Sequence, residues 1–241
     1  MIEVKNLTKY FGNTCAVNDI SFRIEECSVV GFLGPNGAGK STTIRLMSGV
    51  LKPDFGISTI CGYDITTQSL HAQSCFGYLP EAAAGFSNLT VREFLTYCGE
   101  TRKIWGKRLA VAIEKTAEQI ELLPAIDQEI RKLSKGWRQR AWLAQAILHD
   151  PPVLMLDEPT DGLDPNQKDK INNFIRQKRS NKTIILSTHI LEEVEEVCDR
   201  VLIIANGNIV ADSSPEDLAK KYGNLSKAFK NLTTEEMVPL G

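Results

Sequence analysis

The sequence has 241 residues, of which 42% are hydrophobic and 24% are charged, and its formal net charge at pH 7 is −2. These values are ordinary for a globular chain with a substantial buried core, and they exclude disordered and fibrous proteins. The charge balance does not suggest a basic face, so we expect no nucleic-acid partner.

The N-terminus and the cysteines indicate the cellular setting. Residues 1–6 lack the apolar core of a signal peptide. No apolar run approaches the ~18 residues that a membrane helix requires. The cysteines form no C-x-x-C pair and do not cluster with histidines, so we expect reduced thiols in a cytoplasmic protein and no zinc site. They are Cys15, Cys27, Cys61, Cys75, Cys98 and Cys198.

Short apolar runs rich in β-branched residues predict strands. The clearest runs are residues 29–33, 153–156, 183–186 and 201–204. Several are apolar at every position, which is typical of strands buried on both faces of a sheet. Helical stretches lie between them, so the pattern predicts an α/β fold with a largely parallel sheet.

A phosphate-binding motif follows the first of these strands. Its residues are Gly34, Pro35, Asn36, Gly37, Ala38, Gly39, Lys40 and Ser41, and a predicted helix follows at 42–47. This is G-x-x-x-x-G-K-[ST] in the strand–loop–helix context that the motif requires. Glycines let backbone N–H groups wrap phosphates, and the helix N-terminus adds partial positive charge. We expect Lys40 to reach the β- and γ-phosphates of ATP, Ser41 to bind Mg²⁺, and Thr42 to adjoin the nucleotide.

The middle third, residues 86–150, has no comparable strand run and is predicted to be a mostly helical insertion. Thr90-Val91-Arg92-Glu93 has the spacing of a capping box. Residues 109–123 are predicted to form a helix that Pro124 closes. Near the C-terminus, Ser214-Pro215-Glu216-Asp217 predicts a helix start. The segment 224–241 is polar and carries no recognisable motif.

Two carboxylates end the strand that begins at Val153. Asp157 can reach a metal held by the phosphate loop, because Mg²⁺ prefers oxygen ligands. Glu158 then points beyond the γ-phosphate, where a carboxylate can act as general base on water. The alternative for this pair is an acidic cap on the following helix.

Further motifs lie around these two. Leu133-Ser134-Lys135-Gly136-Trp137-Arg138-Gln139-Arg140 resembles the ABC signature sequence, usually L-S-G-G-Q, and precedes a predicted helix at 141–148. Residues 161–165 resemble the D-loop, and Ser187-Thr188-His189 resembles the H-loop. Phe11 resembles the aromatic A-loop residue that stacks on adenine. Together with the phosphate loop and the acidic strand, these motifs resemble an ABC transporter ATP-binding subunit across residues 2–211, in the family's order.

The resemblance implies a P-loop NTPase core with a mostly parallel central sheet, an N-terminal antiparallel β subdomain and an inserted α-helical subdomain. It implies an ATPase domain at 1–223, with the helical subdomain at 86–150, and a separate C-terminal tail at 224–241. It also implies a head-to-tail homodimer or heterodimer, in which Ser134 and Gly136 of one subunit close over ATP bound by the other. His189 would contact the γ-phosphate and help to hold Glu158 and water in line.

The remaining expectations concern partners. A separate transmembrane permease would contact the helical region near Glu81 and Phe86, in a groove that accepts a permease helix. The chain would thus be peripheral to the inner face of the cell membrane and would touch the membrane only through the permease.

Three positions depart from the family pattern. Glu81 stands where a glutamine is usual, and it would either bind Mg²⁺ or serve only as a turn residue. Lys135 replaces a glycine and would assist the γ-phosphate or face solvent. Trp137 replaces a glutamine and would stack near the nucleotide or pack on the permease. The first and third departures resemble the ABC-2-type exporter branch, which favours export.

Several alternatives stay open. Phe11 could be an ordinary core aromatic, and His189 a helix-terminal residue without chemistry. The chain could be a soluble ABC-type ATPase acting on nucleic acid or the ribosome, although it lacks a long insert or a second ATPase domain. A P-loop GTPase or small-molecule kinase would need other motifs: Asn181-Lys182-Thr183-Ile184 begins N-K-x-D but lacks the aspartate. A non-catalytic interaction domain disagrees with the intact Lys40, Asp157, Glu158 and His189.

Overall fold

The computed structural model describes residues 1–82 and 84–234, and its strands form two sheets. In this part of the chain the larger sheet has six strands, in the order β10–β9–β3–β8–β7–β6. All run parallel except β10, which pairs antiparallel with β9 at one edge. Their bounds are β3 (Val29–Leu33), β6 (Phe76–Leu79), β7 (Val153–Asp157), β8 (Thr183–Thr188), β9 (Arg200–Ala205) and β10 (Asn208–Ser213). The mostly parallel sheet that the sequence predicts is confirmed.

Burial on both faces explains why these strands are apolar at every position. In β3, Val29 and Leu33 pack into one hydrophobic cluster, whereas Val30 and Phe32 pack into another. Successive side chains of a strand point to opposite faces, so a strand between two apolar layers needs no polar alternation. The phosphate loop is therefore attached to a strand that is fixed from both sides.

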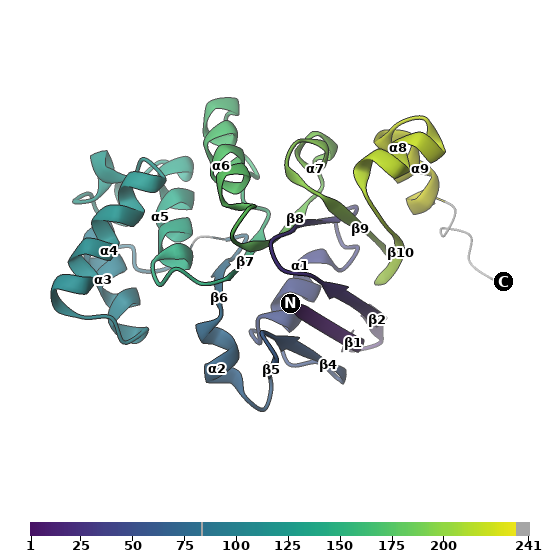
Figure 1. The fold of residues 1–241 in the computed structure, drawn as a ribbon, viewed down its shortest axis with the longest axis horizontal. Helices are drawn as coiled ribbons and strands as arrows, with labels where there is room; N and C mark the ends of the chain where they lie inside the picture. The colour runs from purple at the N-terminus through teal and green to yellow at the C-terminus, as the bar shows by residue number, and fades with distance from the viewer. Residues whose placement is uncertain (83, 235–241) are drawn as a thin grey trace.

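The smaller sheet is antiparallel and contains the N-terminus. Its strand order is β2–β1–β4–β5. Its bounds are β1 (Ile2–Phe11), β2 (Thr14–Ile24), β4 (Phe55–Ile60) and β5 (Tyr63–Asp64). Helix α1 (Lys40–Met47) contacts strands of both sheets and lies between them, as Figure 1 shows. The N-terminal antiparallel unit that the resemblance implies is thus present.

A helical layer is inserted between β6 and β7. It consists of α3 (Val91–Thr101), α4 (Gly106–Gln119) and α5 (Lys135–Ile147), and it forms the left-hand part of the molecule in Figure 1. The capping box is confirmed, because the Glu93 N–H donates to Thr90 Oγ1 over 3.2 Å and the Thr90 N–H donates to Glu93 Oε2 over 2.8 Å. The helix predicted at 109–123 begins and ends earlier, since the chain adopts a positive φ of 53° at Glu121 and leaves the helix there.

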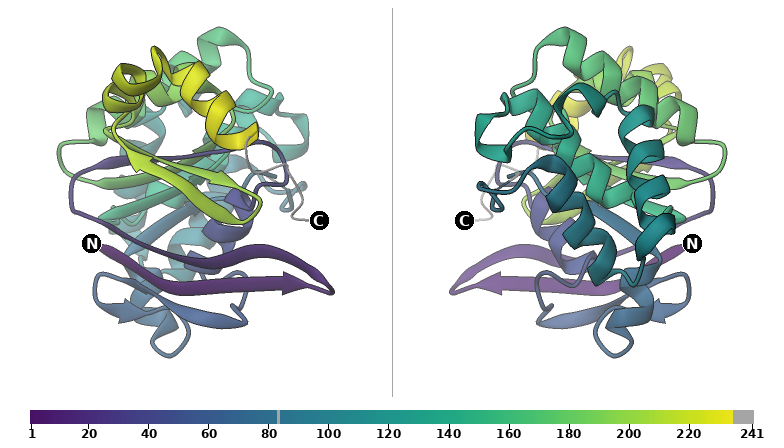
Figure 2. Two further views of the ribbon diagram at one scale, coloured as in Figure 1. Left: turned by 90° about the vertical axis from the view of Figure 1, so that its right-hand side faces the viewer. Right: turned by 90° about the vertical axis from the view of Figure 1, so that its left-hand side faces the viewer.

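Four further helices cover the face of the large sheet opposite α1, as the two views in Figure 2 show. They are α6 (Pro165–Lys178), α7 (Leu191–Val197), α8 (Pro215–Tyr222) and α9 (Leu225–Thr234), and α2 (Ser69–Ser74) precedes β6. The predicted start of α8 is confirmed, because Ser214 Oγ accepts the N–H of Asp217 over 3.1 Å.

Helix α9 lies within the segment that the sequence set apart as a polar tail. Leu225 and Ala228 are fully buried in the core that α9 shares with α7, α8 and β9. The rest of that segment, residues 235–241, lies outside the described residues. Phe229 and Leu232 pack against the same core, so the apolar residues of α9 recur at 225, 228, 229 and 232, which is the spacing of an amphipathic helix.

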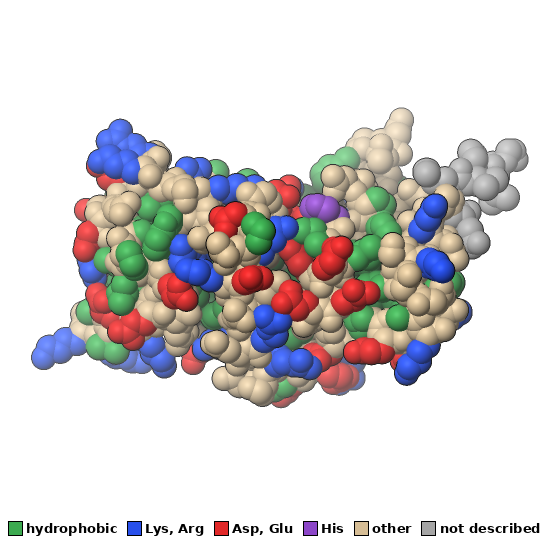
Figure 3. Space-filling model, turned by 90° about the horizontal axis from the view of Figure 1, so that it is seen from above, with side chains coloured by type: hydrophobic (Ala, Val, Ile, Leu, Met, Phe, Trp, Pro, Cys, Tyr) green, Lys and Arg blue, Asp and Glu red, His purple; other side chains and the backbone are tan. Residues whose placement is uncertain are grey.

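No helix in residues 1–82 or 84–234 combines the length and the apolar character needed to cross a membrane. On the face seen in Figure 3, acidic and basic side chains are interspersed. That pattern differs from the continuous basic surface typical of nucleic-acid binding.

Candidate functional site

The phosphate loop joins β3 to α1 and follows a path that requires glycine. Gly37 and Gly39 have φ values of 80° and 108°, which L-residues with a side chain rarely adopt. A Cβ on Gly39 would lie 2.5 Å from the carbonyl oxygen of Ala16, and a Cβ on Gly34 would lie 2.3 Å from that of Ile204. Neighbouring backbone thus holds the loop closely.

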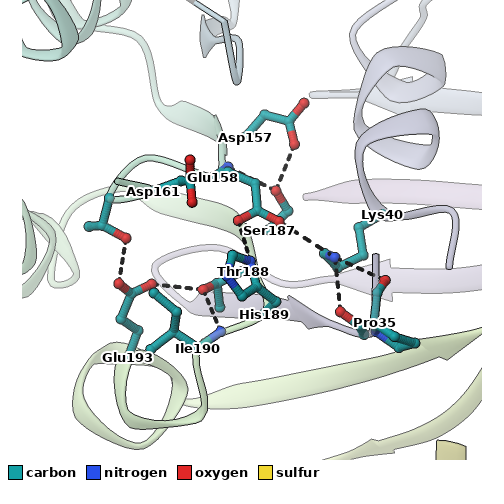
Figure 4. Close-up of polar contacts among 12 residues, drawn as sticks. Pro35, Lys40, Asp157, Glu158, Asp161, Ser187, Thr188, His189, Ile190 and Glu193 are labelled. Atoms are coloured by element: carbon teal, nitrogen blue, oxygen red, sulfur yellow. Dashed lines mark hydrogen bonds and ion pairs between the residues drawn. The ribbon is translucent and has the colours of Figure 1, made fainter. Parts of the chain in front are cut away.

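Lys40 is the first residue of α1, and its side chain folds back over the loop. It is 4% exposed, and its Nζ donates to the carbonyl oxygens of Gly34 at 2.9 Å and Pro35 at 3.3 Å. Nζ also lies 3.5 Å from Oε1 of Glu158, as Figure 4 shows. The ammonium group therefore lies between the phosphate loop and the acidic end of β7.

Asp157 ends β7 and is fully buried. Its Oδ1 accepts a hydrogen bond from Ser187 Oγ at 2.7 Å, whereas Oδ2 has no hydrogen-bond partner in residues 1–82 and 84–234. A buried carboxylate oxygen without a partner is costly, and a cation or its bound water would satisfy it. With the Ser41 hydroxyl in the adjoining pocket, the donors fit Mg²⁺.

Glu158 turns the chain sharply as it leaves β7. Its φ of 49° lies in the left-handed region, which costs a non-glycine residue about 1 kcal/mol. The N–H of Glu158 donates to Ser187 Oγ at 3.0 Å, and this bond fixes the turn to the neighbouring strand β8. Because of that turn, the Glu158 carboxylate faces Lys40 rather than continuing along the strand.

His189 follows β8 and meets Glu158 from the opposite side. Its Nδ1 lies 2.8 Å from Oε2 of Glu158, so the imidazole donates to the carboxylate through Nδ1 and leaves Nε2 for another partner. Asp161 completes this group, since one ligand atom each from Glu158, Asp161 and His189 lie within 4.8 Å of one another. Figure 4 shows the three side chains converging from two loops.

These residues surround one pocket of about 350 Å³. Its lining includes most of the residues that the sequence predicts for the site: Asn36, Gly37, Ala38, Gly39, Lys40, Ser41, Thr42, Glu81, Glu158 and His189. Gly34 and Pro35 support Lys40 from behind, and Asp157 lies buried beneath. Phe11 is not part of the lining: it ends β1 and is 52% exposed. The structure therefore gathers the phosphate and acidic residues and leaves the predicted adenine contact at the surface.

Glu81 lines the pocket, but its carboxylate is directed toward a cation. Oε2 lies 3.5 Å from the Arg45 guanidinium. Tyr78 is close to the same arginine, and burial, followed by the charge of Asp157, raises the pKa of Tyr78 to about 12. Tyr78 is therefore a neutral group between the buried Asp157 and Arg45 at physiological pH.

Ser134 and Gly136 lie outside the pocket lining, at the N-terminus of α5. Ser134 is the N-cap residue, and its Oγ accepts the N–H of Trp137 at 3.4 Å. Lys135 faces the pocket loop of its own chain, because its Nζ lies 3.2 Å from Oδ2 of Asp161. Trp137 is half-buried, with the Arg140 guanidinium 3.8 Å from its ring centroid.

The structure adds four residues to the site. Two of them, Asp161 and Ser187, belong to motifs in the sequence but were given no role there. Ala16 constrains Gly39, Asp161 lines the pocket, Ser187 hydrogen-bonds both Asp157 and Glu158, and Glu193 is described below. Ala16 carries no signal in the sequence, because its contact depends on long-range packing of β2.

Comparisons with known proteins agree with this geometry. The family model described as "ABC transporter" matches residues 17–161. The chain is 35% identical over 218 residues to Nod factor export ATP-binding protein I of Burkholderia lata, covering 90% of this chain and 72% of that protein. It is 36% identical over 205 residues to ABC transporter ATP-binding protein NatA of Bacillus subtilis, covering 84% and 83%. A solved structure described as the ATP-binding subunit of an ABC transporter superposes with a TM-score of 0.86 at 27% identity, covering 96% of this chain and 99% of that one.

Proposed function

The chain belongs to the ABC transporter family as an ATP-binding, ATP-hydrolysing subunit, and from this premise we propose that it powers export through a separate transmembrane permease. Two copies, or one copy and a related ATPase subunit, would close around ATP, and hydrolysis would release them. The observation that carries the hydrolytic part is the Glu158 carboxylate, which lies between Lys40 and His189 beside the phosphate loop.

In the proposed reaction Lys40 exchanges partners. The β- and γ-phosphates would replace Glu158 as the acceptors for Nζ, which frees Oε1 of Glu158 to accept a proton from water. Water then forms a bond to the γ-phosphorus, the bond from that phosphorus to the β–γ bridging oxygen breaks, and the water proton passes to Glu158. The products are ADP and inorganic phosphate. His189 keeps Glu158 oriented through Nδ1 and offers Nε2 to the γ-phosphate.

We assign the Mg²⁺ site to Ser41 and Asp157. The unsatisfied Oδ2 of Asp157 supports this choice, and the ion when bound would neutralise charge on the phosphates. Glu81 would join these ligands only by leaving Arg45, 3.5 Å away.

The second half of the nucleotide site would come from another subunit. Ser134 caps α5 with an exposed hydroxyl, and the adjacent helix N-terminus suits an anion. Since this end of α5 is not part of the pocket in its own chain, a γ-phosphate would meet Ser134 and the Gly136 N–H across a subunit boundary. Phe11 would stack on adenine from the exposed end of β1.

A groove beside the helical layer fits the proposed permease contact. It has a volume of about 920 Å³ and lies between the end of α1, α2, β6 and the helical layer. Its apolar side chains include Val50, Leu70, Phe76, Tyr78, Ile104 and Trp142, and its cations are Arg102, Lys103 and Arg108. Phe86, which we expect near the permease, packs on the same Trp142 with ring centroids 6.1 Å apart.

The charge in the groove indicates what kind of helix it accepts. Arg102 is half-buried, and within residues 1–82 and 84–234 no carboxylate lies within 4.0 Å of it. Its guanidinium donates to the Gln73 carbonyl oxygen at 3.1 Å and to His149 Nε2 at 2.8 Å, but both acceptors are neutral, and burial lowers the pKa of Arg102. We therefore propose that an amphipathic permease helix places a carboxylate there, and that the chain is held at the inner, cytoplasmic face of the membrane through this contact. The name of the Burkholderia relative favours export as the direction.

Co-purification from membranes tests this proposal. Tagged chain is recovered from detergent extracts as wild type, as Lys103→Glu/Arg108→Glu in the groove, and as Lys220→Glu/Lys221→Glu on α8, which makes the same charge change elsewhere. The expected result is a multi-spanning membrane protein that accompanies the wild type and the α8 variant but not the groove variant. Equal recovery with all three chains, or recovery of ribosomal or nucleic-acid partners instead, contradicts the permease role.

A further inference from the structure

A buried carboxylate behind the pocket connects the two loops that carry its acidic and histidine side chains. Glu193 lies on α7 and is 4% exposed. Its Oε1 accepts a close hydrogen bond from Thr160 Oγ1, and its Oε2 accepts one from Thr188 Oγ1 at 2.8 Å. The two threonines are themselves 2% and 1% exposed, so all three side chains are sealed from solvent.

The hydrogen-bond directions at this cluster are determined by its chemistry. Thr188 Oγ1 also accepts the N–H of Ile190 at 3.0 Å, so its own proton must be donated to Glu193. An ionised carboxylate only accepts, which suits two hydroxyl donors. The cluster therefore fixes both threonine rotamers and the backbone turn that follows β8. Figure 4 shows Glu193 joined to Thr188, and Thr188 joined to Ile190.

Each threonine is adjacent in sequence to a pocket residue. Thr160 directly precedes Asp161 and lies two residues after Glu158, while Thr188 directly precedes His189. The Glu158–His189 contact of 2.8 Å therefore joins two loops that Glu193 holds at a fixed spacing. The phosphate loop, by contrast, makes no hydrogen bond to Glu193, Thr160 or Thr188 within the described part of the chain.

Burying the Glu193 carboxylate is energetically unfavourable, so its burial calls for an explanation. No lysine or arginine of residues 1–82 and 84–234 lies within 4.0 Å of it, and two hydroxyl donors only partly replace its hydration. Its place in the first turn of α7 offsets some of the cost through the helix dipole. That explanation serves equally for Glu192, which lies in the same turn but is exposed, so it does not account for the burial of Glu193.

We propose that Glu193 is a positioning residue for hydrolysis, because it locks the Glu158–Asp161 loop to the His189 turn and so sets the catalytic geometry without touching the nucleotide. This inference rests on the proposed roles of Glu158 and His189. It separates two steps: ATP binding depends on the phosphate loop, whereas turnover depends on the lock.

The test compares turnover with ATP affinity in Glu193→Ala, Glu193→Gln and the control Glu192→Ala. For Glu193→Ala we expect kcat to fall at least about tenfold while the Kd for ATP stays within about twofold, because only the hydrolytic residues move. Glu193→Gln keeps one acceptor, so its kcat should lie between that of the wild type and that of Glu193→Ala. The kcat of Glu192→Ala should match the wild type. An unchanged kcat in Glu193→Ala, or equal losses of kcat and affinity, overturns the proposal.

Single-atom variants cover the case in which Glu193→Ala does not fold. Thr160→Val and Thr188→Val each remove one hydroxyl at constant shape, whereas Thr160→Ser and Thr188→Ser keep it. Each valine variant should lower kcat and each serine variant should restore it, and in a double-mutant cycle Thr188→Val should add less than about twofold to Glu193→Gln, since both act through the same lock. Additive losses would overturn the proposal. Glu158→Gln, assayed in parallel, reports on the general base independently: if it hydrolyses ATP normally, the proposed function fails whatever Glu193 does.

Discussion

The helix N-termini of α1 and α5 both offer backbone N–H groups to an anion, but they have different surroundings. At α1, the phosphate loop, Lys40, Glu158 and His189 already converge on one pocket. At α5, Ser134 is exposed, and the pocket residue Asp161 contacts this helix terminus through Lys135 rather than through Ser134. One site is preassembled within a single chain, whereas the other is an isolated half.

This difference indicates how nucleotide binding and assembly are separated. A triphosphate can be bound by α1 and the phosphate loop alone, because the groups that would contact it all lie between strand β3 and helix α1 of one chain. A second anion contact at α5 is gained only when another subunit presents it. Affinity should therefore depend on α1, and assembly on α5.

The largest effect is expected when the preassembled site loses its cation. Lys40→Ala removes charge-assisted contacts to two phosphates, each worth about 1.5–3 kcal/mol, which corresponds to an ATP affinity at least about a hundredfold weaker. Titration calorimetry with ATP measures this loss. Ser134→Ala in the same assay should bind ATP within about threefold of the wild type, since its contact lies on another subunit. A similar loss in both variants would contradict the comparison.

The far end of α5 provides the second prediction, because α5 can present Ser134 accurately only if it is anchored. His149 follows α5; its Nε2 lies 2.8 Å from Nη1 of Arg102, which donates to it. Burial, and then the charge of Arg102, lowers the pKa of His149 to about 4 from its ordinary value of 6.5. The unfolded chain therefore binds a proton that the folded chain refuses, so stability falls as the pH drops from about 6.5 to about 4 and is independent of this group above that window.

The predicted loss is about 3 kcal/mol across that window. Urea unfolding of the wild type and His149→Gln at pH 7 and pH 4.5 measures it, and most of the pH dependence should disappear in the variant. His71→Gln, a change at an exposed histidine, is the control and should keep the wild-type profile. If His149→Gln also keeps that profile, α5 is not anchored by a neutral imidazole.

The sequence predicts the α1 half far better than the α5 half, for a physical reason. The phosphate loop is local: eight consecutive residues set its path, and its strand and helix are the immediate neighbours in the chain. The strands at 29–33 and 183–186 could likewise be predicted, because burial on both faces leaves a continuous apolar run. Contacts between distant segments leave no such pattern.

Three features show what could not be predicted. The Ala16 carbonyl constrains Gly39 through the packing of β2, which depends on the tertiary fold alone. Glu193 resembles any first-turn acid of a helix, and only burial distinguishes it from Glu192. Glu81 was recognised as unusual, but its pairing with Arg45 had no signal in the sequence.

Mixing two inactive chains tests whether the halves come from different subunits. Lys40→Ala chains keep Ser134, and Ser134→Phe chains keep Lys40, so a mixed pair contains one complete site and one doubly defective site. An equal mixture should regain up to about a quarter of the wild-type ATP turnover, well above either variant alone, because about half of random pairs are mixed and each mixed pair has one complete site of two. ATP turnover at fixed total protein measures this gain. The absence of any gain would mean that copies of this chain do not complete one another, and would favour a related ATPase subunit as the partner.

The smallest expected effect concerns an ion pair that connects the two halves within a chain. Lys135 Nζ lies 3.2 Å from Oδ2 of Asp161, and both side chains are more than half exposed, at 56% and 51%. Water and salt screen such a pair, so a double-mutant cycle of Lys135→Ala and Asp161→Ala on urea stability should give a coupling of about 0.5 kcal/mol at low salt and none in ~1 M salt. A coupling above about 1.5 kcal/mol that persists in salt would mean that α5 is tied to the pocket of its own chain. The α5 terminus would then not be free to bind ATP held by a neighbouring subunit. Nucleotide binding and subunit assembly would in that case be coupled through the Lys135–Asp161 pair.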